Sequence, residues 1–134
     1  MVVKINTSST IGLEAYEVSV EIDVANSSNS FVIIVGLPDV AVKEAESRVK
    51  SAIKNSGYTF PSKRVVVNLA PADLKKVGTH FDLPVAVGIL AEEGVLEGEK
   101  LKNYAFLGEL SLDGEINAVR GVLPLVMGLK DVGI

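Results

Sequence analysis

The residues of this chain that could do chemistry gather in one stretch, Val65 to Pro84, with the sequence VVVNLAPADLKKVGTHFDLP. We expect it to form a buried strand, a short helical turn after Pro71, a loop that contains Gly78, and an apolar helix behind Asp82. A loop between a strand and a helix start is where α/β folds often place chemistry, because it is accessible and the first helical N–H groups are unpaired. The alternative is that Pro71, Gly78 and Asp82 only turn the chain and cap the helix.

The common catalytic arrangements lack their residues here. No glycine is followed by a lysine, so there is no Walker A loop, and no G-x-G-x-x-G follows a strand. His80 is the only histidine, and Asp82 lies two residues away, but spacing supplies no third ligand, so no metal site is predicted. With no cysteine, disulfides and thiolate zinc sites are excluded. No nucleophile elbow surrounds a serine. We therefore expect no catalytic residues, and a structural or loop-lining His80.

Composition sets the class of protein. The 134 residues fit one domain, and 48% of them are hydrophobic, yet no apolar run approaches the ~20 residues of a membrane span. We expect a cytoplasmic protein without membrane contact, whose excess apolar side chains fill a core and a surface that meets another domain or subunit. The first residues, MVVKINTSS, lack the pattern of a signal peptide.

Nucleic acid could bind only locally, because the formal net charge of -4 gives no overall attraction to polyanions. The basic residues do cluster in the middle of the chain, at Lys43, Arg48, Lys50, Lys54, Lys63, Arg64, Lys75 and Lys76. We predict that Lys75, Lys76 and His80 form the functional edge that faces DNA, with Lys63 and Arg64 at the opposite end of the strand. The alternative is that these side chains solvate an exposed face.

The first third of the chain predicts strands. Val2 to Ile5 predicts a short strand, and from Gly12 to Val24 apolar and polar residues alternate with period 2, which is typical of a strand with one buried face. Asn26 to Ser30 predicts a loop tip. The run Phe31 to Val35 is apolar throughout, so we expect it to return antiparallel as a central strand covered on both faces.

Three helices are predicted. The first begins at the N-cap Asp39, carries one apolar stripe on a 3.6-residue period, and ends at Gly57. On its other face Glu44 and Arg48 are spaced as an i,i+4 ion pair, like Glu46 and Lys50.

The second helix, from Leu83 to Glu93, is apolar almost all round and should be the most buried, with Asp82 as its cap. Tyr104 to Leu112 and Glu115 to Val119 flank Asp113-Gly114, the signal for a two-residue type I′ hairpin. A third helix follows from Gly121 to Val132.

Three blocks of this sequence carry a resemblance to a known family. They are VGLPDVAVKEAESRVKSAI, NSGYTFPSKRVVVNLAPADLKKVGTHFDLPVAVGILA and FLGELSLDGEINAVRGVLP. Together they resemble the N-terminal domain of the ComM-type, YifB-like, magnesium-chelatase-like AAA+ ATPases. The resemblance covers nearly the whole chain. It implies an α+β fold similar to domain 2 of ribosomal protein S5, with helices packed against a mixed sheet, as in the proteolytic domain of Lon.

The same resemblance implies that this domain is not a protease. Laid on the pattern of Lon-like proteases, the sequence places His80 at the nucleophilic serine and Leu123 at the lysine of the dyad. A hydroxyl nucleophile needs a general base within hydrogen-bond reach, and here neither partner is present. The fold would then be that of a protease domain without the protease.

The resemblance also implies a longer protein. Residues 1–134 would be a single domain, followed after residue 134 by a P-loop module that binds ATP and Mg²⁺ and hydrolyses ATP. The whole would form a homo-oligomeric ring that moves DNA during recombination in natural transformation. This domain would serve oligomerisation or DNA engagement and hold no cofactor of its own. Two alternatives are a vestigial hydrolase and an adaptor for a protein partner without DNA contact.

Overall fold

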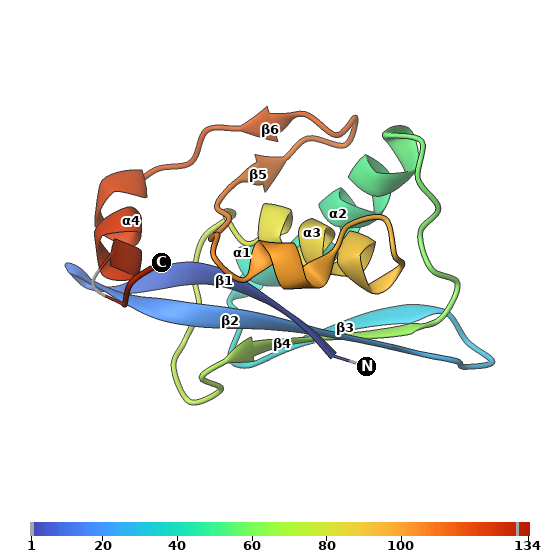
Figure 1. Ribbon diagram of the computed structural model, residues 1–134, viewed down its shortest axis with the longest axis horizontal. Coiled ribbons are helices and arrows are strands. Elements are labelled where there is room, and N and C mark those ends of the chain that lie inside the picture. The colour runs from blue at the N-terminus through green and yellow to red at the C-terminus, as the bar shows by residue number, and fades with distance from the viewer. Residues whose placement is uncertain (1, 131) are drawn as a thin grey trace.

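The computed structural model, which describes residues 2–130 and 132–134, is a sheet with helices on one of its faces (Figure 1). The main sheet has the order β1-β2-β4-β3, and its strands are β1 (Val2–Ile11), β2 (Glu14–Ala25), β3 (Phe31–Val35) and β4 (Arg64–Ala70). β2 pairs antiparallel with both β1 and β4, whereas β3 runs parallel to β4. The mixed sheet and its helices confirm the α+β class.

The other elements lie above this sheet or at its end (Figure 1). They are α1 (Val40–Lys43), α2 (Ala45–Asn55), α3 (Asp82–Glu92), the 3₁₀ helix η1 (Gly98–Leu101), the short hairpin of β5 (Glu109–Leu110) and β6 (Ile116–Asn117), and α4 (Val122–Lys130). Among the described residues, no helix combines the length and the apolar content that a membrane crossing requires.

The period-2 pattern of β2 is confirmed. Val18, Val20 and Ile22 are completely buried beneath the helices, whereas Glu17 on the other face is exposed. α3 lies so close to this face that a Cβ added to Gly88 would meet Cγ1 of Ile22 at 2.5 Å. The sheet therefore has one covered face and one open face.

The prediction for β3 was wrong. β3 is an edge strand, and it does not form a hairpin with β2 because β4 lies between them. Phe31, Ile33 and Val35 are 37%, 41% and 41% exposed on the open face. The unbroken apolar run arises because one set of alternate residues enters the core while the other set remains on the surface.

The first predicted helix is two helices. Asp39 does cap α1, since its Oδ1 accepts a hydrogen bond from the N–H of Val42 at 2.8 Å, but the helix is interrupted at Glu44 before α2 begins. The predicted apolar stripe is buried in the core. Gly57 has a positive φ of 88°, as a residue that ends a helix requires.

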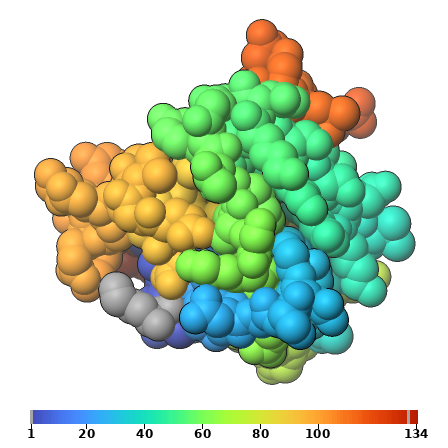
Figure 2. Space-filling view, turned by 90° about the vertical axis from the view of Figure 1, so that its right-hand side faces the viewer, coloured from blue at the N-terminus to red at the C-terminus, as the bar shows by residue number. Residues whose placement is uncertain are grey.

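α3 is the most buried helix, as predicted, and α4 matches the third predicted helix with shorter bounds. The predicted hairpin is shorter too, and its connection is not the two-residue turn. The N–H of Ser111 donates to the carbonyl of Glu115 at 2.8 Å, which leaves three residues in the turn, with Gly114 at φ 95°. Figure 2 shows the orange hairpin region standing out beyond the green surface of α2.

Candidate functional site

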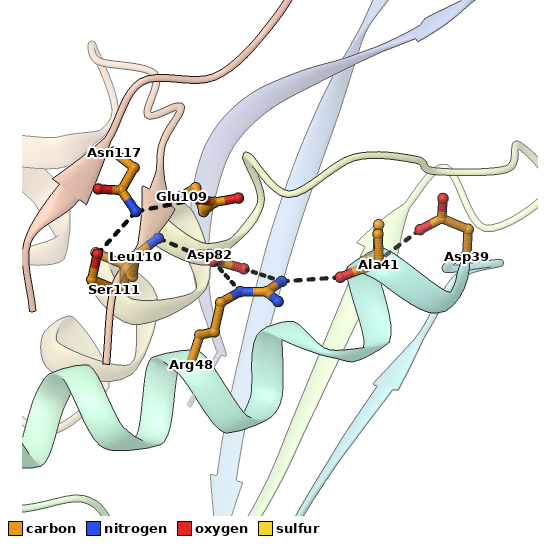
Figure 3. Close-up of polar contacts among 9 residues, drawn as sticks. Asp39, Ala41, Arg48, Asp82, Glu109, Leu110, Ser111 and Asn117 are labelled. Carbon is orange, nitrogen blue, oxygen red and sulfur yellow. Dashed lines mark hydrogen bonds and ion pairs between the residues drawn. The ribbon is translucent and has the colours of Figure 1, made fainter. Parts of the chain in front are cut away.

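Asp82 does not cap α3. The N-cap of that helix is Phe81, and the Asp82 carboxylate points away from the first helical turn. Its Oδ2 accepts hydrogen bonds from Nε of Arg48 at 2.6 Å and from the N–H of Leu110 at 3.0 Å, while Oδ1 accepts from Nη2 of Arg48 at 3.1 Å (Figure 3). The predicted cap is therefore corrected: Asp82 joins α3 to α2 and to β5.

Arg48 completes a bidentate pair with Asp82. The Asp82 side chain is fully buried, whereas that of Arg48 is 22% exposed. The hydrogen bonds to Asp82 raise the pKa of Arg48, so the guanidinium stays charged. Burial raises the pKa of Asp82, and the bonds from Arg48 and from the N–H of Leu110 oppose that rise. Nη2 of Arg48 also donates to the carbonyl of Ala41 at 3.1 Å, which ties α1 to the same cluster.

The hairpin adds a second, exposed layer to this cluster. Nδ2 of Asn117 donates to Glu109 at 3.2 Å and to Oγ of Ser111 at 2.9 Å (Figure 3). Hydrogen bonds from Thr79 and Asn117 lower the pKa of Glu109. The bonds of Asn117 hold the two strands of the hairpin together, and they place no nucleophile beside a base. The cluster connects α1, α2, α3 and β5 to one another.

Lys76 does not belong to a charged edge, which corrects the prediction for this residue. Its side chain is completely buried, and Nζ donates to the carbonyl of Gly36 at 2.8 Å and to the carbonyl of Pro71. Burial lowers its pKa, because the charged amine has lost its water. The ammonium of Lys76 is therefore engaged inside the protein, where it links Gly36, directly after β3, to Pro71, directly after β4.

His80 is also buried, at 6% exposed. Its Nε2 donates to the carbonyl of Ser8, 2.7 Å away, an acceptor on the edge of β1. Burial lowers the pKa of His80, so the ring is neutral at neutral pH. Nδ1 lies over Gly78, where an added Cβ would meet it at 2.9 Å, and Gly78 has a positive φ of 103°. His80 is therefore a loop residue that donates a hydrogen bond to the edge of β1. Gly78 is needed because a side chain there would meet the His80 ring.

The loop and the start of α4 meet at one pocket of about 350 Å³. Gly78 and His80 line it from the loop, and Arg120 and Pro124 line it from the other segment. The two segments that carry the protease-dyad positions are thus brought together. Leu123, at the lysine position, is 70% exposed and apolar.

The remaining basic residues of the prediction are separated. Lys75 is exposed, and its carbonyl accepts a hydrogen bond from the Tyr16 hydroxyl at 2.8 Å. Arg64 is exposed and Lys63 is half-buried at the far end of β4. Of the three residues proposed for the DNA-facing edge, only Lys75 is on the surface. No group of three or more potential metal ligands gathers among the described residues.

Sequence reasoning missed the role of Arg48. Its spacing from Glu44 predicted a surface ion pair along the helix, but the structure turns the guanidinium inward to Asp82. Because Asp82 lies 34 positions after Arg48, the sequence around Arg48 does not indicate this pairing. The useful hint was the apolar surroundings of Asp82, since a carboxylate in a buried helix requires a partner.

Comparisons with known proteins place the chain in a family. The family model described as "Subunit ChlI of Mg-chelatase" matches residues 20–134. The competence protein ComM of Haemophilus influenzae is 43% identical over 121 residues, which are 90% of this chain and 24% of ComM. YifB of Escherichia coli is 42% identical over 119 residues, 89% of this chain and 23% of YifB. A Mycobacterium bovis protein, Mb2921c, is 40% identical over 122 residues, 91% of this chain and 24% of that protein.

The chain thus spans about a quarter of the length of these curated relatives. The resemblance to the ComM-type, YifB-like domain is confirmed by the family model and by these relatives. The chain belongs to the family of the ChlI subunit of Mg-chelatase, as a ComM- and YifB-like member.

Proposed function

We propose that this chain is the non-catalytic N-terminal domain of a ComM-like AAA+ ATPase that moves DNA during recombination in natural transformation. It adopts a fold similar to domain 2 of ribosomal protein S5 and acts in the cytoplasm. Its role is assembly: it packs against other parts of a homo-oligomeric ring. ATP and Mg²⁺ belong to a P-loop module elsewhere in the full-length protein, since this chain has no Walker A sequence.

The observation that carries the assembly role is the distribution of apolar and basic side chains on the surface. Apolar residues are exposed on β3 and along α4, including Phe31, Ile33 and Leu123 at 37%, 41% and 70%. At the loop where DNA contact was expected, Lys76 and His80 are buried. Large exposed apolar patches are typical of surfaces that meet protein, whereas DNA contacts require accessible cations.

The absence of catalysis rests on the loop itself. Nε2 of His80 is engaged by the carbonyl of Ser8, and the pKa of His80 is lowered by burial. Leu123 brings no amine to the dyad position. These two side chains do not form the nucleophile and base that acyl transfer needs, which supports a non-catalytic domain.

Two assays test the proposal. ATP turnover that DNA stimulates is expected for the full-length protein and not for residues 1–134 alone. Sedimentation velocity of full-length protein with and without residues 1–134 measures assembly directly, and the deletion should shift it to smaller species. Normal assembly without this domain, or ATP turnover by residues 1–134, would count against the proposal.

The second candidate is an adaptor for a protein partner without DNA contact. It is favoured by the same exposed apolar residues and by the formal net charge of -4. The two differ in their partner: an assembly domain contacts its own polypeptide or its copies. If the deletion leaves the ring intact but removes binding of a second protein, the adaptor function is supported instead.

A further inference from the structure

α4 has an apolar face that the described residues leave uncovered. The helix buries Leu125 and Leu129 against the sheet, at 3% and 4% exposed. The rest of its surface carries four apolar side chains that are partly exposed, Val122, Leu123, Val126 and Met127, at 42%, 70%, 46% and 57%. These four side chains are spaced at i, i+1, i+4 and i+5, so they form one continuous stripe. We call them the α4 stripe.

A groove of about 470 Å³ runs beside the stripe. The extended segment Ala105–Leu107 lines one side, and residues 116–119 with Val122 of the stripe line the other. In Figure 1, the chain leaves β6 and runs across to α4, away from the segment that leads into β5.

One wall of this groove is an unused strand edge. Ala105 forms a parallel bridge with Asn6 of β1, and the N–H of Phe106 donates to the Asn6 carbonyl at 2.9 Å. Since alternate residues of a strand direct their backbone groups to opposite sides, those of Ala105 and Leu107 point away from β1. Within residues 2–130 and 132–134, neither residue makes a backbone hydrogen bond on that side. An unpaired edge of this kind accepts another strand.

We propose that the groove and the α4 stripe bind a strand from the remainder of the full-length polypeptide, which adds to the edge of Ala105–Leu107 and covers the stripe. The proposal rests on the proposed function, in which this chain is one domain of a longer protein. The relative ComM is long enough to include such a segment, because the region that this chain matches is 24% of its length. The occupant is an extended segment with apolar side chains at alternate positions.

The path to the groove is short. The N–H of Ile134 donates to the carbonyl of Leu129 at 3.2 Å, so this residue sits at the last turn of α4. The nine residues of α4 span about 13 Å. About four or five extended residues would return a polypeptide alongside the helix to the groove, because a strand rises about 3.3 Å per residue. A segment of the same polypeptide therefore reaches the site without a long linker.

Cysteine labelling of the full-length protein tests whether the stripe is covered. Residues 1–134 contain no cysteine, so Leu123→Cys and Met127→Cys each give one new thiol in this domain, and labelled peptides identify it by mass. Leu13→Cys is the matched control, because Leu13 is 99% exposed at the turn between β1 and β2. We expect maleimide to label positions 123 and 127 at least about tenfold more slowly than position 13. Equal rates would overturn the proposal.

Hydrogen exchange on the unmodified full-length protein tests whether the cover is a strand. The amides of Phe106 and Gly108 are internal controls, since they already donate to Asn6 and His80. We expect the amides of Ala105 and Leu107 to be protected to a similar degree. Rapid exchange at Ala105 and Leu107 beside protected controls would overturn strand addition.

Dilution of the full-length protein distinguishes cover by the same polypeptide from cover by a second copy. Cover by the same polypeptide is independent of protein concentration, so loss of protection on dilution would also overturn the proposal. ATP turnover measured on the same samples keeps the two hypotheses apart. If DNA-stimulated turnover is missing while positions 105, 107, 123 and 127 stay protected, the proposed function fails and the strand inference stands.

Discussion

The buried pair of Asp82 and Arg48 gives the most specific stability prediction. Asp82→Ala removes the acceptor of two bonds from Arg48, at 2.6 and 3.1 Å, and of one bond from the N–H of Leu110 at 3.0 Å. Breaking a buried ion pair by removing one partner costs about 3–5 kcal/mol. Because the Arg48 side chain is 22% exposed, water can reach part of the guanidinium, so we expect about 3 kcal/mol, the lower end of that range.

Urea denaturation of the domain near pH 7 measures this loss, and Asp39→Ala is the matched control. Asp39 is a true N-cap, so its replacement should cost about 1 kcal/mol. A double-mutant cycle with Arg48→Ala should give a coupling free energy of about 2 kcal/mol. If Asp82→Ala costs no more than Asp39→Ala and the coupling is close to zero, the assigned role of Asp82 is wrong.

Three further predictions concern the loop and the sheet. Lys76→Met should lower the free energy of unfolding by about 1–3 kcal/mol, because it leaves two carbonyls without a donor. It should leave the DNA affinity of the full-length protein unchanged. A loss of affinity in fluorescence anisotropy, with unchanged stability in urea denaturation, would contradict the burial of Lys76. Burial lowers the pKa of His80, so the unfolded state binds more protons and the free energy of unfolding should fall as pH drops below about 6.5. His80→Gln should lose less stability than wild type between about pH 7.5 and 5.5, and an equal loss would refute the assignment. Gly36 and Gly57 both have positive φ, 102° and 88°, but only at Gly36 would a Cβ meet a carbonyl oxygen, at 2.3 Å. Gly36→Ala should therefore lower the melting temperature further than Gly57→Ala, and equal shifts would contradict this packing.

The parts of the fold that local pattern controls were predictable. The 3.6-residue stripe of α2 and the near-continuous apolar character of α3 reflect burial directly, and the alternation in β2 reports one covered face. Asp39 is a cap because its acceptor and the N–H of Val42 are three residues apart. In each case the partners are close in sequence or the signal repeats along one element.

The site was harder to predict because its partners are distant in sequence. Asp82 has the residue type and position of a cap, but Arg48 and the N–H of Leu110 compete for the same oxygens and provide a charged partner. Lysines are almost never fully buried, so nothing in the sequence marks Lys76 as an internal donor to two carbonyls. The strand order that leaves β3 at an edge depends on β4, which lies about thirty residues later.

The salt dependence of DNA binding by the full-length protein, with and without residues 1–134, tests the assembly role most directly. Each phosphate contact contributes about one unit to the slope of log affinity against log salt concentration. If this domain serves assembly, then at concentrations where both forms are equally oligomeric the two slopes should agree within about one unit. A slope that falls by two units or more without the domain, with the ring unchanged, would show that it binds DNA and would contradict the account.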